Sequence, residues 1–386
     1  MKLRIINRLF AAELLAQSVA IYSVSAIMFS ERSGLSTSQV GLLLSVFAVT
    51  TLIFEIPTGL LADKFSRKWA LVLGRLLLAG SMAMWLFVPQ FWGYAAGMAL
   101  MGVAESTVSG ALQAYLYESL GENKKLFNKY NARLWSVMMT GWMIGAGVAS
   151  LFGPRYTVLL VFSIAAPLVS ACIAWTLPTD AAEENKDTTS LRLFTGAARF
   201  IMSTKGLIYA FLSIVTMKVL VDVLIEYIPL YYKGAGATTR IVPVIFLIGN
   251  FFTIFLFWHA DKLVHLLRKR ELTTGLLFLL LLVFSRYMGT VAAIAGIFLY
   301  VRYVRILFVN LESEFQHMAV NKYRATLGSL YSMGARLLAA ASFALIGYAS
   351  KQTYLTPIIV FTIILYTLHR VLYVSSASYR TDPSQE

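Results

Sequence analysis

Long apolar runs separated by short polar segments dominate this chain. A helix needs about 20 residues to cross the hydrocarbon core of a bilayer, and runs of about that length recur along the whole sequence. The expected spans are Arg8–Phe29, Val40–Ala62, Trp69–Val88, Phe91–Tyr117, Ala132–Phe152, Tyr156–Leu177, Gly206–Tyr231, Ile241–Ala260, Thr273–Tyr287, Thr290–Leu311, Ala325–Ala349 and Tyr354–Val374. The pattern therefore predicts an all-α integral membrane protein with 12 transmembrane helices.

The amino-acid composition argues against a soluble protein. Of the 386 residues, 58% are hydrophobic and 13% are charged, whereas a soluble domain carries about 25% charged residues. The single cysteine, Cys172, falls inside an apolar run, which argues against a disulfide framework and against a cysteine metal site. The apolar stretch after Arg8 continues to about Phe29, too far for a signal peptide, so we expect it to remain as the first span.

The basic residues predict the orientation of the chain. A net charge of +14 would suggest nucleic-acid binding in a soluble protein. Here Lys and Arg gather in short clusters between the spans, as they do when they set membrane topology. With both termini cytoplasmic, 22 of the 33 basic residues fall on the inside and 5 on the outside. We therefore expect a multi-pass protein of the cytoplasmic (inner) membrane that contacts lipid and binds no nucleic acid.

A repeated turn divides the chain into two halves. Asp63-Lys64 follows the second expected span, and Asp261-Lys262 follows the eighth. The one sizeable polar stretch lies between the sixth and seventh spans. We therefore expect an N-terminal six-helix bundle at 1–178, a cytoplasmic linker at 179–205 and a C-terminal six-helix bundle at 206–386. Such duplication is typical of secondary transporters.

The first copy of the turn carries a more specific resemblance. Gly59-Leu-Leu-Ala-Asp63-Lys64-Phe-Ser-Arg67-Lys68 resembles the signature loop of the major facilitator superfamily, G-x-x-x-D-[RK]-x-x-[RK]-[RK]. Ser109–Leu120 and Tyr323–Leu327 are similar to stretches in a bacterial, efflux-like branch of that family. The resemblance implies two pseudo-symmetric six-helix bundles that transport by alternating access. The chain departs from the pattern at Ser66, where the family favours glycine, and at Glu105, because antiporters of the branch carry an arginine in the fourth span.

The loop is a candidate latch between conformations. A carboxylate at an inner helix end can interact with helix dipoles, and basic side chains there can reach lipid headgroups or facing helix ends. The alternative is that the basic residues only signal topology. The predicted gating residues are Gly59, Asp63, Arg67, Lys68 and Asp261.

Several charges lie within the expected spans. An ionised side chain at the bilayer centre costs at least about 2.5–3.5 kcal/mol, so each needs a partner, a water cavity or a function. The candidates for a proton or substrate pathway are Glu13, Glu105, Lys218, Asp222, Glu226, Arg302, Arg305 and Arg336. All except the last fall on the first, fourth, seventh and tenth spans, which the family resemblance places around a central cavity.

Alternative interpretations stay open for some of these charges. The spacing of four between Lys218 and Asp222 allows a structural pair as well as a pathway. Glu226 has no partner left on its own helix and is therefore the better candidate for a carboxylate that loads and releases a proton. Arg336 is interpreted either as a pathway residue or as a tie between helices.

Aromatic residues on the same spans are candidate substrate contacts, with helix packing as the alternative for each of them. They are Tyr22, Tyr115, Tyr227, Tyr300 and Tyr303. The four histidines have no metal-ligand spacing, and no glycine loop that could cradle phosphate is evident, so we expect no cofactor, no metal and no ATP-driven transport.

The sequence as a whole favours a monomeric secondary transporter and not an enzyme. The leading hypothesis is proton-coupled export of a small organic, amphiphilic or charged solute. An importer or uniporter of a sugar, peptide or siderophore has the same fold and stays open. A receptor or scaffold that transports nothing is disfavoured, because it has no need to keep costly charges inside its spans.

Overall fold

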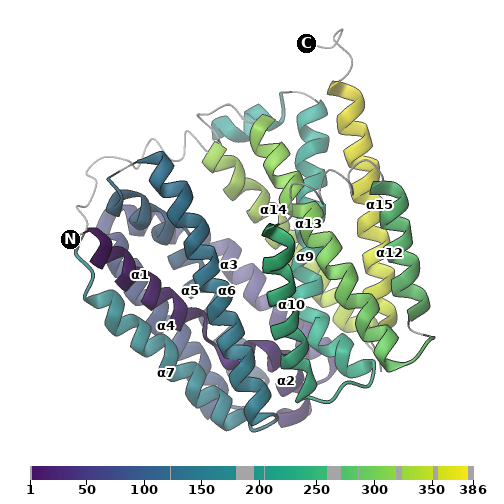
Figure 1. Cartoon of the computed structure of the whole chain (residues 1–386), viewed down its shortest axis with the longest axis horizontal. Coiled ribbons are helices and arrows are strands. Elements are labelled where there is room, and N and C mark those ends of the chain that lie inside the picture. The colour runs from purple at the N-terminus through teal and green to yellow at the C-terminus, as the bar shows by residue number, and fades with distance from the viewer. Residues whose placement is uncertain are drawn as a thin grey trace. The chain divides into compact units, whose positions relative to one another are not determined.

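The computed structural model describes residues 2–121, 123–179, 195–203, 205–258, 271–285, 287–318, 324–350 and 355–380. Within these residues the regular elements are helices, without a strand. They are α1 (Lys2–Gln17), η1 (Ala20–Val24), α2 (Ser25–Ser33), α3 (Thr37–Phe65), α4 (Arg67–Phe87), α5 (Phe91–Ser119), α6 (Lys124–Phe152), α7 (Tyr156–Trp175), α9 (Lys205–Gly234), α10 (Ile241–Trp258), α12 (Glu271–Ser285), α13 (Thr290–Met318), α14 (Arg324–Ala349) and α15 (Leu355–Arg380) (Figure 1).

The helices confirm an all-α membrane fold. In the described part of the chain, 10 segments are long and apolar enough to cross a membrane, and Ile241–Ile254 and Glu271–Ser285 are shorter apolar helices. Each of these segments overlaps one of the expected spans. Many of their large apolar side chains point outward and are exposed, Leu151 and Val291 among them. Surfaces of this kind are suited to lipid rather than water.

The chain divides into two compact units. Unit 1 comprises Met1–Asn185 and Thr238–Ile254, and unit 2 comprises Lys186–Ala237 and Phe255–Glu386. In unit 1, α4 packs against α5 and α7, and α3 packs against α5. One core cluster of this unit draws apolar side chains from α1, α4, α5, α6 and α7, including Leu9, Leu71, Leu116 and Leu134.

The first span is not the continuous helix that the sequence predicts. It is interrupted at Ser18 and Val19 and continues through η1 into α2. A buried side chain satisfies one of the freed backbone groups, because the Ser163 hydroxyl of α7 accepts from the Ile21 N–H at 3.1 Å. Gly145 of α6 permits the close approach, since a Cβ there would lie 2.9 Å from the Val19 carbonyl oxygen. An interruption inside a membrane is tolerated only with such partners.

Local signals in the sequence place two helix boundaries. Ser36 and Gln39 form a reciprocal capping box at the start of α3, where each accepts from the backbone N–H of the other. Between α3 and α4, Ser66 has φ 155°, the one positive φ at a non-glycine position among the described residues. This is the position where the family favours glycine. A backbone that prefers glycine explains that preference.

Unit 2 is organised around α9. This helix packs against α13, α14 and α15, and α12 packs against α13 (Figure 1). The Tyr227 hydroxyl of α9 donates to the Phe343 carbonyl oxygen of α14 at 2.6 Å. The helix that carries Lys218, Asp222 and Glu226 is therefore the one with neighbours on several sides, which places its charges inside the unit.

Candidate functional site

An ion pair lies in the middle of α9. The Lys218 ammonium Nζ is 2.5 Å from Asp222 Oδ1, and both side chains are mostly buried. The other carboxylate oxygen, Oδ2, is buried without a hydrogen-bond partner. Asp222 sits two to three residues from the middle of α9, about 4 Å along a helix that rises 1.5 Å per residue. The pair therefore lies at the depth where an ion is most expensive.

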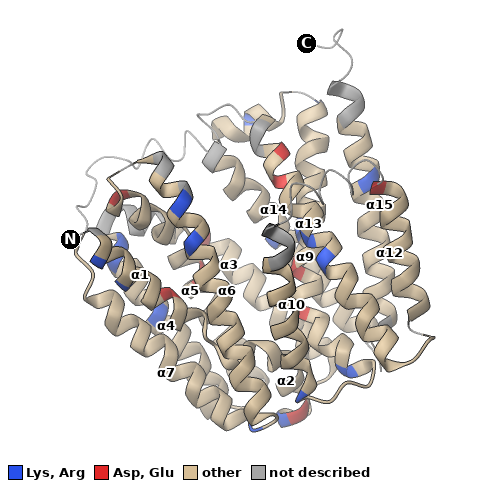
Figure 2. Ribbon diagram, in the orientation of Figure 1, with Lys and Arg blue, Asp and Glu red and all other residues tan. Residues whose placement is uncertain are grey.

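Two arginines of α13 lie at a similar depth. Arg302 is 7% exposed, and its guanidinium stacks 4.6 Å from the centroid of the Phe298 ring. Arg305 is partly buried and within electrostatic range of Arg302 and of Asp222. The structure thus brings together Lys218, Asp222, Arg302 and Arg305, which the sequence predicts as pathway residues on two different spans. Figure 2 shows isolated basic (blue) and acidic (red) positions on α9 and α13 within helices that are mostly uncharged.

The cluster extends to α14. Tyr331 of α14 donates a hydrogen bond to Glu312 of α13 and lies within electrostatic range of Asp222. Helices α9, α13 and α14 of unit 2 therefore share one polar cluster. The sequence analysis selects neither Tyr331 nor Glu312. Nothing in the local pattern marks a tyrosine whose partner is a carboxylate 19 residues earlier.

The remaining predicted pathway residues of unit 2 are Glu226 on α9 and Arg336 on α14, both partly buried. In unit 1, Glu105 is exposed on α5. Glu13 of α1 is 1% exposed and accepts from the guanidinium of Arg75 on α4, while its second oxygen is buried without a hydrogen bond. The structure therefore joins Glu13 to a residue that the sequence analysis had not selected.

Most of the tyrosines predicted as substrate contacts instead form hydrogen bonds within the protein or are buried in its packing. The Tyr115 hydroxyl donates to the Pro178 carbonyl oxygen at 2.9 Å, and Tyr227 bonds to α14 as described above. The Tyr303 hydroxyl belongs to a network described below. Tyr300 is fully buried, and its hydroxyl has no hydrogen bond. Tyr22 lies in η1, next to the interruption of the first span, and is partly buried.

One predicted latch residue has a defined partner. Arg67, at the start of α4, forms an ion pair with Glu118 at the end of α5. Lys68 is buried, and its ammonium lies 5.2 Å from the centroid of the Trp69 ring. The side chains of Gly59 and Asp63 and the whole of Asp261 lie outside what the structure describes. Among the proposed latch residues, the structure thus describes the side-chain contacts of Arg67 and Lys68.

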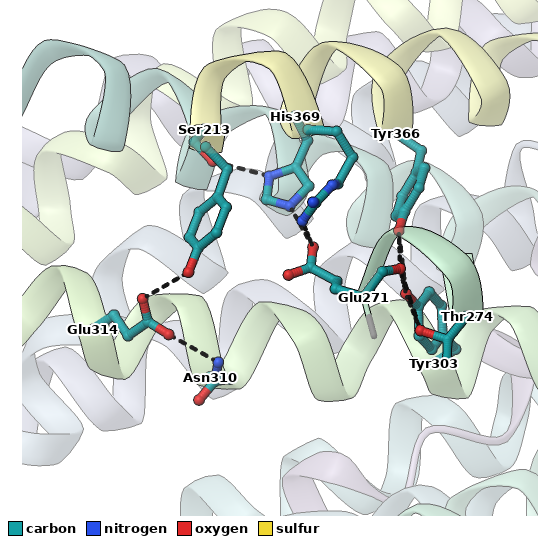
Figure 3. Close-up of polar contacts among 10 residues, drawn as sticks. Ser213, Glu271, Thr274, Tyr303, Asn310, Glu314, Tyr366 and His369 are labelled. Carbon is teal, nitrogen blue, oxygen red and sulfur yellow. Dashed lines mark hydrogen bonds and ion pairs between the residues drawn. The ribbon is translucent and has the colours of Figure 1, made fainter. Parts of the chain in front are cut away.

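The sequence analysis selected only Tyr303 from a buried network in unit 2 (Figure 3). His369 of α15 is 2% exposed; its Nδ1 lies 2.9 Å from the Ser213 hydroxyl of α9 and its Nε2 lies 3.5 Å from Glu271 Oε1. The neighbouring Arg370 reaches the same oxygen at 2.6 Å, as an ion pair that lacks the angle of a hydrogen bond. One carboxylate at the start of α12 thus faces two basic groups of α15.

The backbone of Glu271 is a second centre of this network. Its carbonyl oxygen accepts from the hydroxyls of Tyr303 at 3.1 Å and Tyr366 at 3.2 Å, and these hydroxyls lie 3.1 Å apart. Thr274 donates to the same carbonyl at 3.2 Å. The partners are separated by up to 95 residues in the chain. No spacing rule could have joined them, although Glu271 directly follows a run of basic residues.

The described residues contain no group of three or more His, Cys, Asp and Glu side chains that could hold a metal ion. The arrangement that they do contain is a set of buried charges at mid-span depth within a bundle of apolar helices. Buried charge of this kind marks solute and ion pathways in membrane proteins. The fold and the cluster therefore define a polytopic membrane protein of the transporter class.

Comparison with known proteins gives the family. The sequence profile of the Major Facilitator Superfamily matches residues 9–344, and the chain belongs to that family. An uncharacterized transporter of Buchnera aphidicola is 22% identical over 302 residues, 76% of each chain. The multi-drug resistance efflux pump PmrA of Streptococcus pneumoniae is 29% identical over 153 residues, 38% of each chain.

Solved structures agree on the fold. A mutant of the nucleoside transporter NupG superposes with a TM-score of 0.75 at 15% identity, covering 98% of this chain and 99% of that one. At this identity the likeness concerns the fold alone. Together with the family match, it establishes a transporter of the secondary type with the fold of the Major Facilitator Superfamily.

Proposed function

We propose that the protein exports a small organic, amphiphilic or charged solute by alternating access, coupled to protons. The observation that carries the proposal is the cluster of Lys218, Asp222 and Arg305 at mid-span depth, shared by α9 and α13. A transporter of this fold must expose one central site to each side of the membrane in turn. Charges kept at that depth, at a cost of about 2.5–3.5 kcal/mol or more each, are explained by a solute or a proton that they handle.

Proton coupling is proposed to use the carboxylates of α9. Asp222 faces Lys218 on its own helix, Arg305 on α13 and Tyr331 on α14. Proton uptake by Asp222 would break its ion pair with Lys218 and so release the lysine. Glu226, one turn further along the helix, is the second candidate. A carboxylate whose partners are basic can therefore change charge as a cycle proceeds.

Export is the proposed direction of transport. The partial similarity to an efflux pump favours export, and the fold itself is shared by importers. We also propose that both termini lie on the cytoplasmic side of the inner membrane, because the distribution of Lys and Arg supports that orientation. The protein is proposed to act as a monomer. The halves 1–178 and 206–386 would then move against each other, with Gly59, Asp63, Arg67, Lys68 and Asp261 forming the cytoplasmic latch.

The test is solute movement in proteoliposomes under an imposed pH gradient. Vesicles with a fixed mixture of metabolites and antibiotics are incubated with and without the gradient, and their contents are compared by mass spectrometry. We expect at least one solute to move in a gradient-dependent way with the wild-type protein and not with Asp222→Asn plus Glu226→Gln. Glu183→Gln, a carboxylate between the sixth and seventh expected spans, is the matched control and should behave like wild type. Movement that ignores the gradient, or that survives the double change, contradicts proton coupling through α9.

A further inference from the structure

Arg305 is a cation without a partner in the middle of a span. It lies one residue from the centre of Thr290–Met318, about 1.5 Å along the helix. Among the described residues it forms no ion pair and no hydrogen bond, and the charges that act on it are those of Arg302 and Asp222. A guanidinium stays protonated in proteins, so the positive charge cannot be removed by loss of a proton.

The carboxylate next to it does not neutralise it. Asp222 is already paired through Oδ1 with Lys218 at 2.5 Å. Those two charges cancel, which leaves the charge of Arg305 in excess, with Arg302 as a further positive neighbour. An unpaired ion at this depth is unfavourable, and a second positive charge on the same helix adds to the cost. Among Lys218, Asp222, Arg302 and Arg305, positive charge therefore exceeds negative charge.

Asp222 also has a carboxylate oxygen that forms no hydrogen bond. Its Oδ2 is buried and accepts no hydrogen bond, although a carboxylate oxygen has the capacity for two. Burying an acceptor without a partner costs about 1–3 kcal/mol. The cluster thus presents an unsatisfied donor fork at Arg305 and an unsatisfied acceptor at Asp222, on two helices that pack against each other.

We propose that Arg305 binds the carboxylate of the transported solute and that Asp222 Oδ2 accepts a hydrogen bond from a donor on the same molecule. The solute class is a small organic acid that carries an amino or hydroxyl group. Arginine suits this role better than lysine because its planar fork donates two parallel hydrogen bonds to one carboxylate. This inference rests on the proposed function, since it names the solute of the same site.

The test is equilibrium binding to the full-length protein in lipid nanodiscs, with no gradient present. The probes are organic acids with three to ten carbons, each in amino, hydroxy and unsubstituted forms, and each paired with its neutral amide. Thermal melting and titration calorimetry report the affinity. Because a hydrogen bond to a charged group contributes about 1.5–3 kcal/mol, we expect amino or hydroxy acids to bind about 10- to 150-fold more tightly than their amides.

Substitutions of Arg305 and Asp222 test which residue causes each binding preference. Arg305→Gln should remove the preference for acid over amide, and Arg305→Lys should weaken acid binding several-fold while keeping it. Asp222→Asn should reduce the preference for amino or hydroxy acids over unsubstituted acids. Arg199→Gln changes an exposed arginine in the same unit and should bind like wild type.

Other outcomes overturn the inference. It fails if no acid binds better than its amide, if inorganic phosphate binds as tightly as the acids, or if Arg305→Gln keeps the acid preference. Should Arg305→Gln fail to purify as a single species, unchanged acid affinity in Arg305→Lys overturns it instead. Because binding is measured without a gradient, an acid-selective protein that moves solute independently of protons would contradict the proposed coupling and leave this inference standing.

Discussion

The buried ion pair of unit 1 offers the sharpest test of the structural reasoning. Arg75 on α4 donates to Glu13 on α1, and the side chains are 6% and 1% exposed. The pair thus joins the first span to the third at a position that water barely reaches. The test makes Glu13→Leu and Arg75→Met singly and together.

The magnitude follows from the burial. Removing one partner leaves the other charge buried and unpaired, which costs about 3–5 kcal/mol. Replacing both partners by apolar side chains of similar volume is often neutral or stabilising by about 1–4 kcal/mol, because two ions no longer have to be desolvated. The unsatisfied Glu13 Oε2 adds to that expectation, since the double change removes a buried acceptor without a partner. Each single variant should therefore be less stable than the double variant.

The assay is thermal melting of the purified variants in one detergent, with the free energy of unfolding compared through the full mutant cycle. Each single variant is predicted to melt well below the wild type, and the double variant to melt near it. Such non-additivity is expected only when two residues interact directly. Arg155→Gln, an exposed arginine in the same unit, is the control and should melt like wild type.

One result would refute this reasoning, and a second measurement distinguishes two roles of Glu13. Additive losses, with the double variant the least stable, would mean that Glu13 and Arg75 do not act as a pair. Transport by the double variant separates two roles of Glu13. If the carboxylate only holds α1 to α4, transport should survive in the apolar pair; if Glu13 also lies on the proton or substrate pathway, stability returns and transport does not.

Three further predictions follow from other elements. Asp63→Asn should impair transport more than Asp261→Asn, because only the first is followed closely by a basic pair; equal losses would count against this ranking. Ser66→Gly should raise the stability by about 1 kcal/mol in thermal melting, because glycine adopts the positive φ of this position without strain, and an unchanged or lower melting temperature would contradict it. Glu271→Gln should cost about 2–3 kcal/mol, allowing for partial exposure, and adding Arg370→Gln should recover part of that loss; a further loss would show that the two residues are not coupled.

The membrane spans could be predicted from the sequence because the bilayer imposes one length and one polarity on each of them. All of the described span helices overlap the expected ones. The interruption at Ser18 could not be predicted, because the apolar pattern continues through it. It depends on partners from distant helices, namely the Ser163 hydroxyl and the close approach allowed by Gly145.

The candidate site was predictable in part, and for a physical reason. Lys218, Asp222 and Arg305 stand out because an ion inside an apolar run is rare and costly. Glu271 and His369 do not stand out, since each lies near the end of a span where polar residues are ordinary. Their contact joins positions 98 residues apart in the chain, and it becomes visible only when the helices are packed.

The central claim is that the charge cluster of α9 and α13 couples a solute to protons. The most direct measurement is the internal pH of proteoliposomes loaded with a pH-sensitive dye, followed after amino and hydroxy acids are added outside. The account predicts solute-dependent proton movement with the wild-type protein and none with Asp222→Asn or Arg305→Gln. Solute transport without any change in internal pH, or proton movement that persists in both variants, would contradict it.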